Sequence, residues 1–251
     1  MLPLPDLTLL EWLLVVAGAT GIGIAKAGFS GVNFVHLIVF ALIFGPREST
    51  GIILPMLIVG DIAAVIAFRQ HARWDYIRQM LPPACVGVVA GSFMMARIDD
   101  GVFTPLIGWI LVVLTTMQLV HMWRPGLFAG APQSKPFAWL TGLVAGGTTM
   151  MANGAGPIIA LFALAVGLPK WEFVGTSAWF FLIINVFKLP FSYGLGLIHA
   201  PTLSLNLVLA PAVVAGITIG RWLVHAVPQG IFNTLLLVFA AVAALRLIGV
   251  F

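Results

Sequence analysis

Apolar residues in this chain form long unbroken runs rather than the short periodic patterns of a soluble protein. A single helical crossing of a membrane takes about 20 residues. Eight runs approach or exceed that length, at about 12–44, 52–68, 79–96, 102–122, 137–168, 174–197, 203–224 and 230–249. The first and fifth runs are too long for one straight helix and too short for two full ones. We expect each of them to be either one long, unwound helix or a hairpin of two half-helices.

Glycine clusters lie at the centres of these two long runs, at Gly21–Gly31 and Gly146–Pro157. Each glycine lowers the stability of a helix by roughly 1 kcal/mol relative to Ala. A broken helix at membrane depth persists where it is buried in protein or lines a cavity. Two interrupted hydrophobic segments at matching positions of two halves are typical of a transporter's binding site.

The composition also indicates a helical membrane protein. Hydrophobic residues make up 61% of the chain and charged residues 8%, whereas an ordinary soluble protein has about 25% charged residues. The sequence lacks the ten-residue segments of alternating polarity that are typical of membrane β-barrels. We therefore predict an all-α polytopic membrane protein that has the lipid bilayer as its surroundings and no nucleic-acid partner.

Few side chains are suited to catalysis or metal binding. The single cysteine, Cys85, excludes an intramolecular disulfide and a thiolate metal cluster. The spacing of the histidines matches no metal site. The sequence also contains no nucleophile–base constellation, so we expect no cofactor, no metal and no enzymatic activity.

The two halves of the chain repeat one another. In the clearest match, Gly87-Val-Val-Ala-Gly91…Gly101-Val-Phe103 has the same spacing as Gly216-Ile-Thr-Ile-Gly220…Gly230-Ile-Phe232 over seventeen residues. Other landmarks pair as Trp12 with Trp139, Gly31 with Gly156, Gly51 with Gly175, and Asp61 with Asn185. We predict a first transmembrane repeat at 1–124, a central linker at 125–136 and a second repeat at 137–251, a duplication common among secondary transporters.

The positions of the basic residues favour an inverted repeat. Lys and Arg gather in cytoplasmic loops. If the fifth run crosses once, six basic residues fall inside and four outside, whereas a hairpin there gives seven inside and three outside. These counts leave out the intramembrane residues Lys26 and Lys188. The sequence therefore favours about eight hydrophobic segments in two inverted halves, with a broken or re-entrant first helix in each half.

The first glycine cluster predicts an anion site around a buried lysine. Lys26 places a full positive charge half way along an apolar run, and a charge there usually marks a functional site. Backbone N–H groups freed at the start of a half-helix also suit an oxyanion. Further ligands expected from this stretch are Gly28, Ser30, Gly31 and Asn33. The alternatives are close helix packing through Ala27-xxx-Gly31 and a Lys26 side chain that reaches an interface.

The second cluster offers neutral hydrogen-bond donors in place of a lysine. Asn153, Gly154 and Gly156 are the expected ligands, with Thr148 and Thr149 nearby. Pro157 suits the first turn of a new helix, where its missing N–H does no harm. The alternative is a glycine–proline kink in which the threonines are already hydrogen-bonded.

Three further polar residues lie within apolar runs. Asp61 either pairs with Lys26 or titrates and carries a proton, unless it is an acid at a helix end. Its repeat mate Asn185 is a neutral isostere. Lys188 follows Asn185 on the same helical face and is either a second cation for the anion or, beside Pro190, a residue that reaches the interface. His36 is either a polar partner or a packing histidine.

Several of these motifs together resemble one membrane-protein family. They are Gly-Ile-Ala-Lys-Ala-Gly-Phe-Ser-Gly at 23–31, Pro46-Arg47, Leu54-Pro55, Gly60-Asp61, and Leu81-Pro82 followed by Gly87-xxx-Gly91. Over nearly its whole length the chain resembles the sulfite exporter TauE/SafE family, also called the toluene sulfonate uptake permease family. The resemblance implies secondary transport of sulfite, sulfoacetate or other organosulfonates across the bacterial inner membrane. Many members carry Gly-x-Gly-Gly-Gly at the first break, and Lys26 among the glycines is a departure shared by a subset.

From the residues and the resemblance together we expect a secondary transporter of small sulfur-containing anions, with Asp61 as the candidate for proton coupling. The expected substrate-binding residues are Lys26, Gly28, Ser30, Gly31, Asn33, Asn153, Gly154, Gly156, Asn185 and Lys188. The alternative is a passive anion channel or a transporter of another small organic anion. The sequence makes no prediction of oligomeric state.

Overall fold

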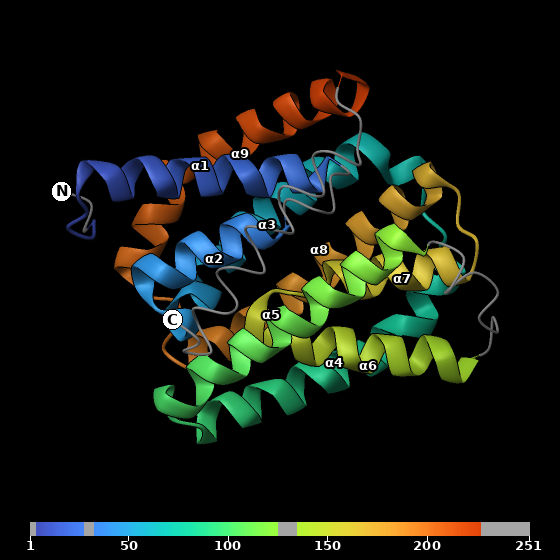
Figure 1. Cartoon of the computed structure of the whole chain (residues 1–251), viewed down its shortest axis with the longest axis horizontal. Coiled ribbons are helices and arrows are strands. Elements are labelled where there is room, and N and C mark those ends of the chain that lie inside the picture. The colour runs from blue at the N-terminus through green and yellow to red at the C-terminus, as the bar shows by residue number, and fades with distance from the viewer. Residues whose placement is uncertain (1–3, 28–32, 125–134, 227–251) are drawn as a thin grey trace.

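The computed structural model describes residues 4–27, 33–124 and 135–226, and within these ranges the chain is helical without strands (Figure 1). The helices are α1 (Leu9–Lys26), α2 (Asn33–Phe44), α3 (Pro46–Phe68), the short 3-10 helix η2 (Arg69–His71), α4 (Trp74–Arg97), α5 (Asp100–Trp123), α6 (Lys135–Ala152), α7 (Gly156–Ala165), α8 (Lys170–Gly194) and α9 (Ala200–Ala226). Five described helical segments are long and apolar enough to cross a membrane. The predicted all-α membrane class is confirmed.

Both long apolar runs are divided into two helices. The first run gives α1, of 18 residues, and α2, of 12 residues, while the fifth gives α6, of 18 residues, and α7, of 10 residues. At 1.5 Å per residue the second arms are about 15–18 Å long, roughly half of the 30 Å hydrocarbon layer. In Figure 1, α2 turns back beside α1. The second arm of each run is therefore too short to cross the membrane alone.

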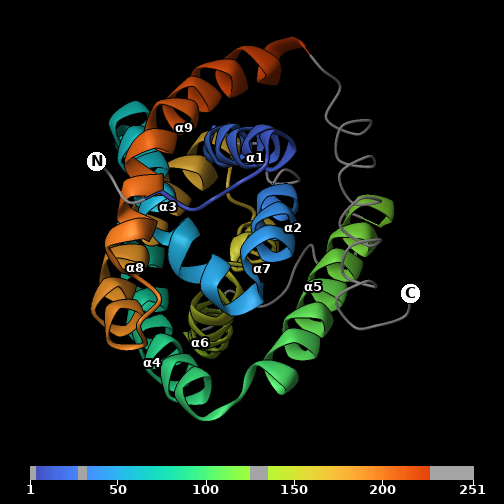
Figure 2. The same cartoon turned by 90° about the vertical axis from the view of Figure 1, so that its left-hand side faces the viewer.

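The broken helices are buried near their breaks, as at Ala25 and Ala152, while the outer faces of α1 and α6 carry exposed residues such as Leu13 and Trp139. Seen end-on in Figure 2, α1, α2, α6 and α7 lie between α5 on one side and α3, α4, α8 and α9 on the other. This position agrees with the expectation that interrupted backbone at membrane depth is shielded by protein.

Glycines allow the broken helices to approach their neighbours closely. A Cβ atom added at Gly23 of α1 would collide with the Val213 carbonyl of α9, and one added at Gly146 of α6 would collide with the Ala84 carbonyl of α4. The partner helices also present glycines at these contacts: Gly216 of α9 faces the backbone of α1, and Gly87 of α4 faces the backbone of α6. The glycine blocks matched between the two halves therefore have the same packing role, which explains why their spacing is repeated.

Two adjacent glycines of α6 provide a test of this packing. We expect Gly146→Ala to destabilise the protein by roughly 1–3 kcal/mol, because the added methyl group enters the backbone of α4. For Gly147→Ala we expect no loss, since the nearest atom, the Gly87 carbonyl oxygen, lies 3.8 Å from its added Cβ and Ala favours a helix. Melting temperatures of the two variants in one detergent make the comparison. Equal melting temperatures would contradict the packing role of Gly146.

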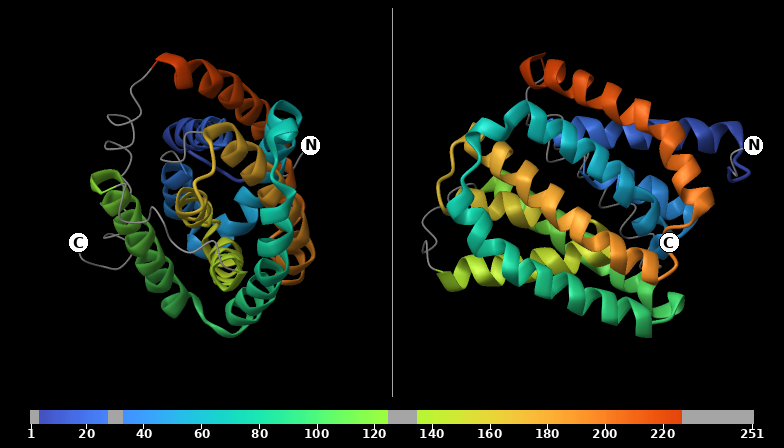
Figure 3. Two further views of the ribbon diagram at one scale, coloured as in Figure 1. Left: turned by 90° about the vertical axis from the view of Figure 1, so that its right-hand side faces the viewer. Right: turned by 180° about the vertical axis from the view of Figure 1, so that it is seen from behind.

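The first broken helices of the two halves run in opposite directions. Figures 1 and 3 show α1 leading from the N-terminal end of the bundle and α6 returning toward that end. The last apolar run, at 230–249, lies outside the described residues. The inverted repeat of eight segments and its boundaries at 124 and 137 therefore stay predictions.

Polar side-chain contacts join the two halves at both ends of the bundle. At one end Arg73, just before α4, lies 3.0 Å from Glu172 in the first turn of α8. Hydrogen bonds to Asp75 and Glu172 raise the pKa of the Arg73 guanidinium. At the other end His199, just before α9, lies 3.5 Å from Glu48 in the first turn of α3.

Candidate functional site

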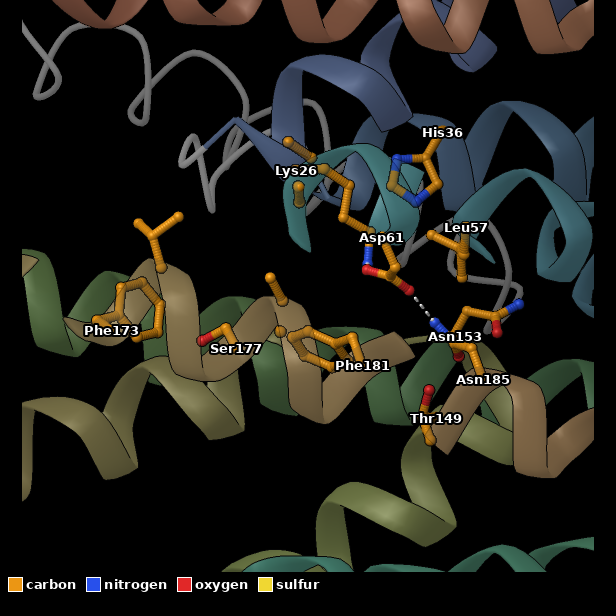
Figure 4. Close-up of a pocket in the computed structure, with 15 residues that line it drawn as sticks. Lys26, His36, Leu57, Asp61, Thr149, Asn153, Phe173, Ser177, Phe181 and Asn185 are labelled. Carbon is orange, nitrogen blue, oxygen red and sulfur yellow. Dashed lines mark hydrogen bonds and ion pairs between the residues drawn. The ribbon is translucent and has the colours of Figure 1, made fainter. Parts of the chain in front are cut away.

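A buried ion pair joins the end of the first broken helix to α3. Lys26 is the last residue of α1, and its Nζ lies 2.5 Å from Oδ1 of Asp61. Asp61 is fully buried, and the Lys26 side chain is 11% exposed. The two side chains meet in Figure 4. Lys26 therefore points to an acid inside the protein rather than to the membrane surface.

Asp61 also connects the two halves of the chain. Its second oxygen, Oδ2, accepts a hydrogen bond of 2.7 Å from Nδ2 of Asn185 on α8. The sequence alignment of the halves matches these two residues with each other. Asp61 lies well inside α3, which starts at Pro46, so it is not an acid at a helix end. Of the three interpretations of Asp61 from the sequence, the structure shows the pairing with Lys26.

The small residue beside Asp61 makes room for the lysine. A Cβ atom at Gly60 would lie 3.0 Å from Cγ of Lys26, tighter than an ordinary van der Waals contact. Nζ of Lys26 also lies 4.6 Å from the centre of the Phe181 ring, within the range of a cation–π interaction. The Gly60-Asp61 pair of the sequence therefore supplies both the counter-charge and the space that Lys26 needs.

Lys188 binds the end of the second broken helix. Its Nζ donates hydrogen bonds to the Thr149 carbonyl at 2.7 Å and to Oδ1 of Asn153 at 2.5 Å. The Thr149 carbonyl belongs to the last turn of α6, where the helix dipole favours a positive charge. Lys188 is 1% exposed. The interpretation in which it reaches the interface is therefore wrong.

Asn153 holds the turn between α6 and α7. Its φ of 52° lies in the left-handed region, which Asn adopts more readily than most residues. Its Nδ2 donates a hydrogen bond of 3.0 Å to the Thr50 carbonyl of α3. The break in the second half is thus fixed by contacts from both α3 and α8.

A cavity of about 70 Å³ adjoins these groups. A single water needs about 10–15 Å³ of such space, so the cavity is large enough for a small anion. Its polar lining comes from Lys26, His36, Asp61, Thr149, Asn153, Ser177 and Asn185, and its apolar lining includes Phe173 and Phe181 (Figure 4). Two broken helices and the long helices α3 and α8 all contribute to it.

The charged groups of this cluster do not cancel. Counted at their formal charges, the described residues of this cluster include two cations, Lys26 and Lys188, and one anion, Asp61. Isolated charge in a low-dielectric interior is costly. A bound anion would compensate it.

The cavity brings together five of the ten predicted ligands and the predicted proton carrier, Asp61. Lys26, Asn153, Gly156, Asn185 and Asp61 line the cavity, while Lys188 reaches it through its hydrogen bonds to Asn153 and Asn185. Gly154 is in the turn before α7 but is not among the lining residues. Gly28, Ser30 and Gly31 lie outside the described residues, and so does the side chain of Asn33, the first residue of α2.

Sequence reasoning did not select Ser177, Phe173 or Phe181 as site residues. All three lie on one side of α8, each one helical turn from the next, and Phe181 lies one turn before Asn185. A helical stripe that included Asn185 and Lys188 could have pointed to them. Inside a continuous apolar run, however, a phenylalanine that faces a cavity has the same appearance as one that faces lipid.

Comparison with protein families decides the wider assignment. The family model described as Sulfite exporter TauE/SafE matches residues 13–247, which include every residue of the cluster. The chain belongs to this family. Comparison with individual curated proteins gives no match.

TauE/SafE proteins are membrane transporters of the sulfite and sulfonate type rather than enzymes. The resemblance found in the sequence is therefore confirmed, and the chain is a multi-pass membrane transporter. The segments that carried the resemblance, with Lys26 in one and Gly60-Asp61 in another, meet at the buried ion pair.

Proposed function

We propose that the protein is a secondary transporter that binds a small sulfur oxyanion, sulfite or an organosulfonate, in the cavity beside Lys26. The observation that carries this proposal is the buried cluster with one surplus formal positive charge next to a cavity of about 70 Å³. Gly156 also lines the cavity and begins α7, and the start of a helix favours negative charge. We place the transporter in the bacterial inner membrane.

The anion and a proton bind together in this proposal. At rest, Asp61 is the counter-ion of Lys26. When Asp61 takes up a proton, Lys26 is released, and a bound anion becomes its counter-ion instead. Coupling of this kind is reciprocal, so the proton raises the affinity for the anion and the anion raises the affinity for the proton.

The charge balance of the cluster suits a small anion of one or two charges. When Asp61 is protonated, Lys26 and Lys188 carry two formal positive charges, so a monovalent sulfonate compensates one of them and a divalent anion compensates both. The choice of sulfite and organosulfonates in this proposal follows from the family rather than from this charge balance.

Both halves supply the site, as expected if they move against each other. Lys26 and Asp61 come from the first half, whereas Asn153, Asn185 and Lys188 come from the second. In many transporters with two repeats, one repeat rocks against the other around a site near the midplane. We propose the same kind of alternating access here.

Ligand-induced thermal stabilisation of the purified protein tests the proposal. A ligand at about 100 times its Kd stabilises the native state by about 2.7 kcal/mol. We expect the melting temperature to rise with the concentration of methanesulfonate and of sulfite at mildly acidic pH. A shift with a cation or a neutral solute, and none with a sulfur oxyanion, would overturn the proposal.

A further inference from the structure

The hydroxyl group of Ser177 lacks the hydrogen bond that most helical hydroxyls make. A Ser or Thr inside a helix commonly donates to a carbonyl three or four residues earlier in the same helix. Such bonds are made here by Thr20, Ser49, Thr50, Ser92, Thr148, Ser204 and Thr218. Oγ of Ser177 is buried and has no hydrogen-bond partner among the described residues.

This hydroxyl group lies at the cavity. Ser177 is a lining residue, placed between Phe173 and Phe181 along α8 (Figure 4). A buried polar group without a hydrogen-bond partner destabilises the folded protein. Such a cost is offset when a ligand supplies the missing partner.

Ser177 and Lys26 line the same cavity. Phe181, whose ring lies 4.6 Å from the Lys26 Nζ, follows Ser177 by one turn of α8. A small oxyanion in this cavity is therefore offered both a charged and a neutral hydrogen-bond donor.

We propose that Ser177 donates a hydrogen bond to an oxygen of the transported anion and so selects oxyanions over other monoanions. The inference rests on the proposed function, because it assigns a further residue to the same site. Lys26 supplies charge, which any monoanion satisfies. Ser177 supplies a directed donor, which requires an acceptor oxygen.

The experiment compares Ser177→Ala with Ser177→Thr, which keeps the hydroxyl group, and with Ser92→Ala. Ser92 is a matched control because it is a buried helical serine, and its hydroxyl donates to Val89 of its own helix. The probes are methanesulfonate and iodide, a monoanion that is a poor hydrogen-bond acceptor. Affinities come from titration of the melting temperature, and the protein without ligand is measured in parallel.

We expect Ser177→Ala to weaken methanesulfonate binding roughly tenfold or more, since a hydrogen bond to a charged group contributes about 1.5–3 kcal/mol. Iodide affinity and the melting temperature without ligand should not fall, because the hydroxyl has no partner in the empty protein. Ser177→Thr and Ser92→Ala should keep the methanesulfonate affinity.

Two results would overturn the role of Ser177 and leave the proposed function intact. One is equal methanesulfonate affinity in Ser177→Ala and the unchanged protein. The other is a loss of affinity for both probes together with a lower melting temperature without ligand, which would indicate a structural role. If the unchanged protein binds no sulfur oxyanion, the proposed function fails, and this inference fails with it.

Discussion

Replacing Lys26 with Gln is expected to weaken the binding of methanesulfonate roughly 100-fold or more and to abolish transport. Loss of one member of a buried charge pair costs about 2–5 kcal/mol in binding. In the proposal the anion is the second partner of Lys26, so the variant removes the charge that compensates it. Isothermal titration and uptake into proteoliposomes measure the two effects.

This variant needs a control for folding. Lys26→Gln leaves the fully buried Asp61 with the Asn185 amide as its remaining partner. Breaking a buried ion pair from one side typically destabilises by about 3–5 kcal/mol. The double variant Lys26→Gln, Asp61→Asn removes both charges and should recover most of that stability. We expect it to fold and still not to bind the anion.

The outcome for the double variant separates two roles of the lysine. If it binds methanesulfonate as tightly as the unchanged protein, Lys26 is a structural partner of Asp61 and not a ligand. Lys188 would then be the cation to test next, since it lies on the other side of Asn185.

The central ion pair could be predicted from the sequence because charges are so rare in it. Lys26 and Asp61 are charged residues deep in apolar runs, and a buried charge needs a partner. With few candidates available, pairing with Lys26 is one of the three interpretations of Asp61 that the sequence leaves open. The two interruptions were also predictable, because glycine clusters weaken helices wherever they occur.

The role of individual glycines could not be predicted in the same way. Both close packing and a bound anion call for backbone without a side chain, so the two roles give the same residue type. At Gly23 and Gly146 the structure shows packing against α9 and α4. The sequence also could not decide whether the Lys188 side chain points into the protein or toward the membrane surface. Pro190 beside it indicated the surface, while its hydrogen-bond acceptor in α6 is about 40 residues away in the chain.

Replacing Asp61 with Asn is expected to separate anion binding from its dependence on protons. The variant has the side chain of its repeat mate, Asn185, and removes the carboxylate that competes with the anion for Lys26. In the unchanged protein we expect anion affinity to rise as the pH falls, because protonation of Asp61 frees Lys26. In Asp61→Asn the affinity should be high and nearly independent of pH.

Two transport assays should give different results for this variant. Exchange of labelled for unlabelled methanesulfonate across proteoliposomes needs anion binding alone, so we expect Asp61→Asn to retain it. Accumulation driven by an imposed pH gradient needs a proton carrier, so we expect it to be lost. Asp75→Asn is the matched control, since Asp75 is 49% exposed and pairs with Arg73 at the end of the bundle. If Asp61→Asn still accumulates the anion in response to a pH gradient, Asp61 does not carry the coupled proton, and its contact with Lys26 serves to hold α1 against α3.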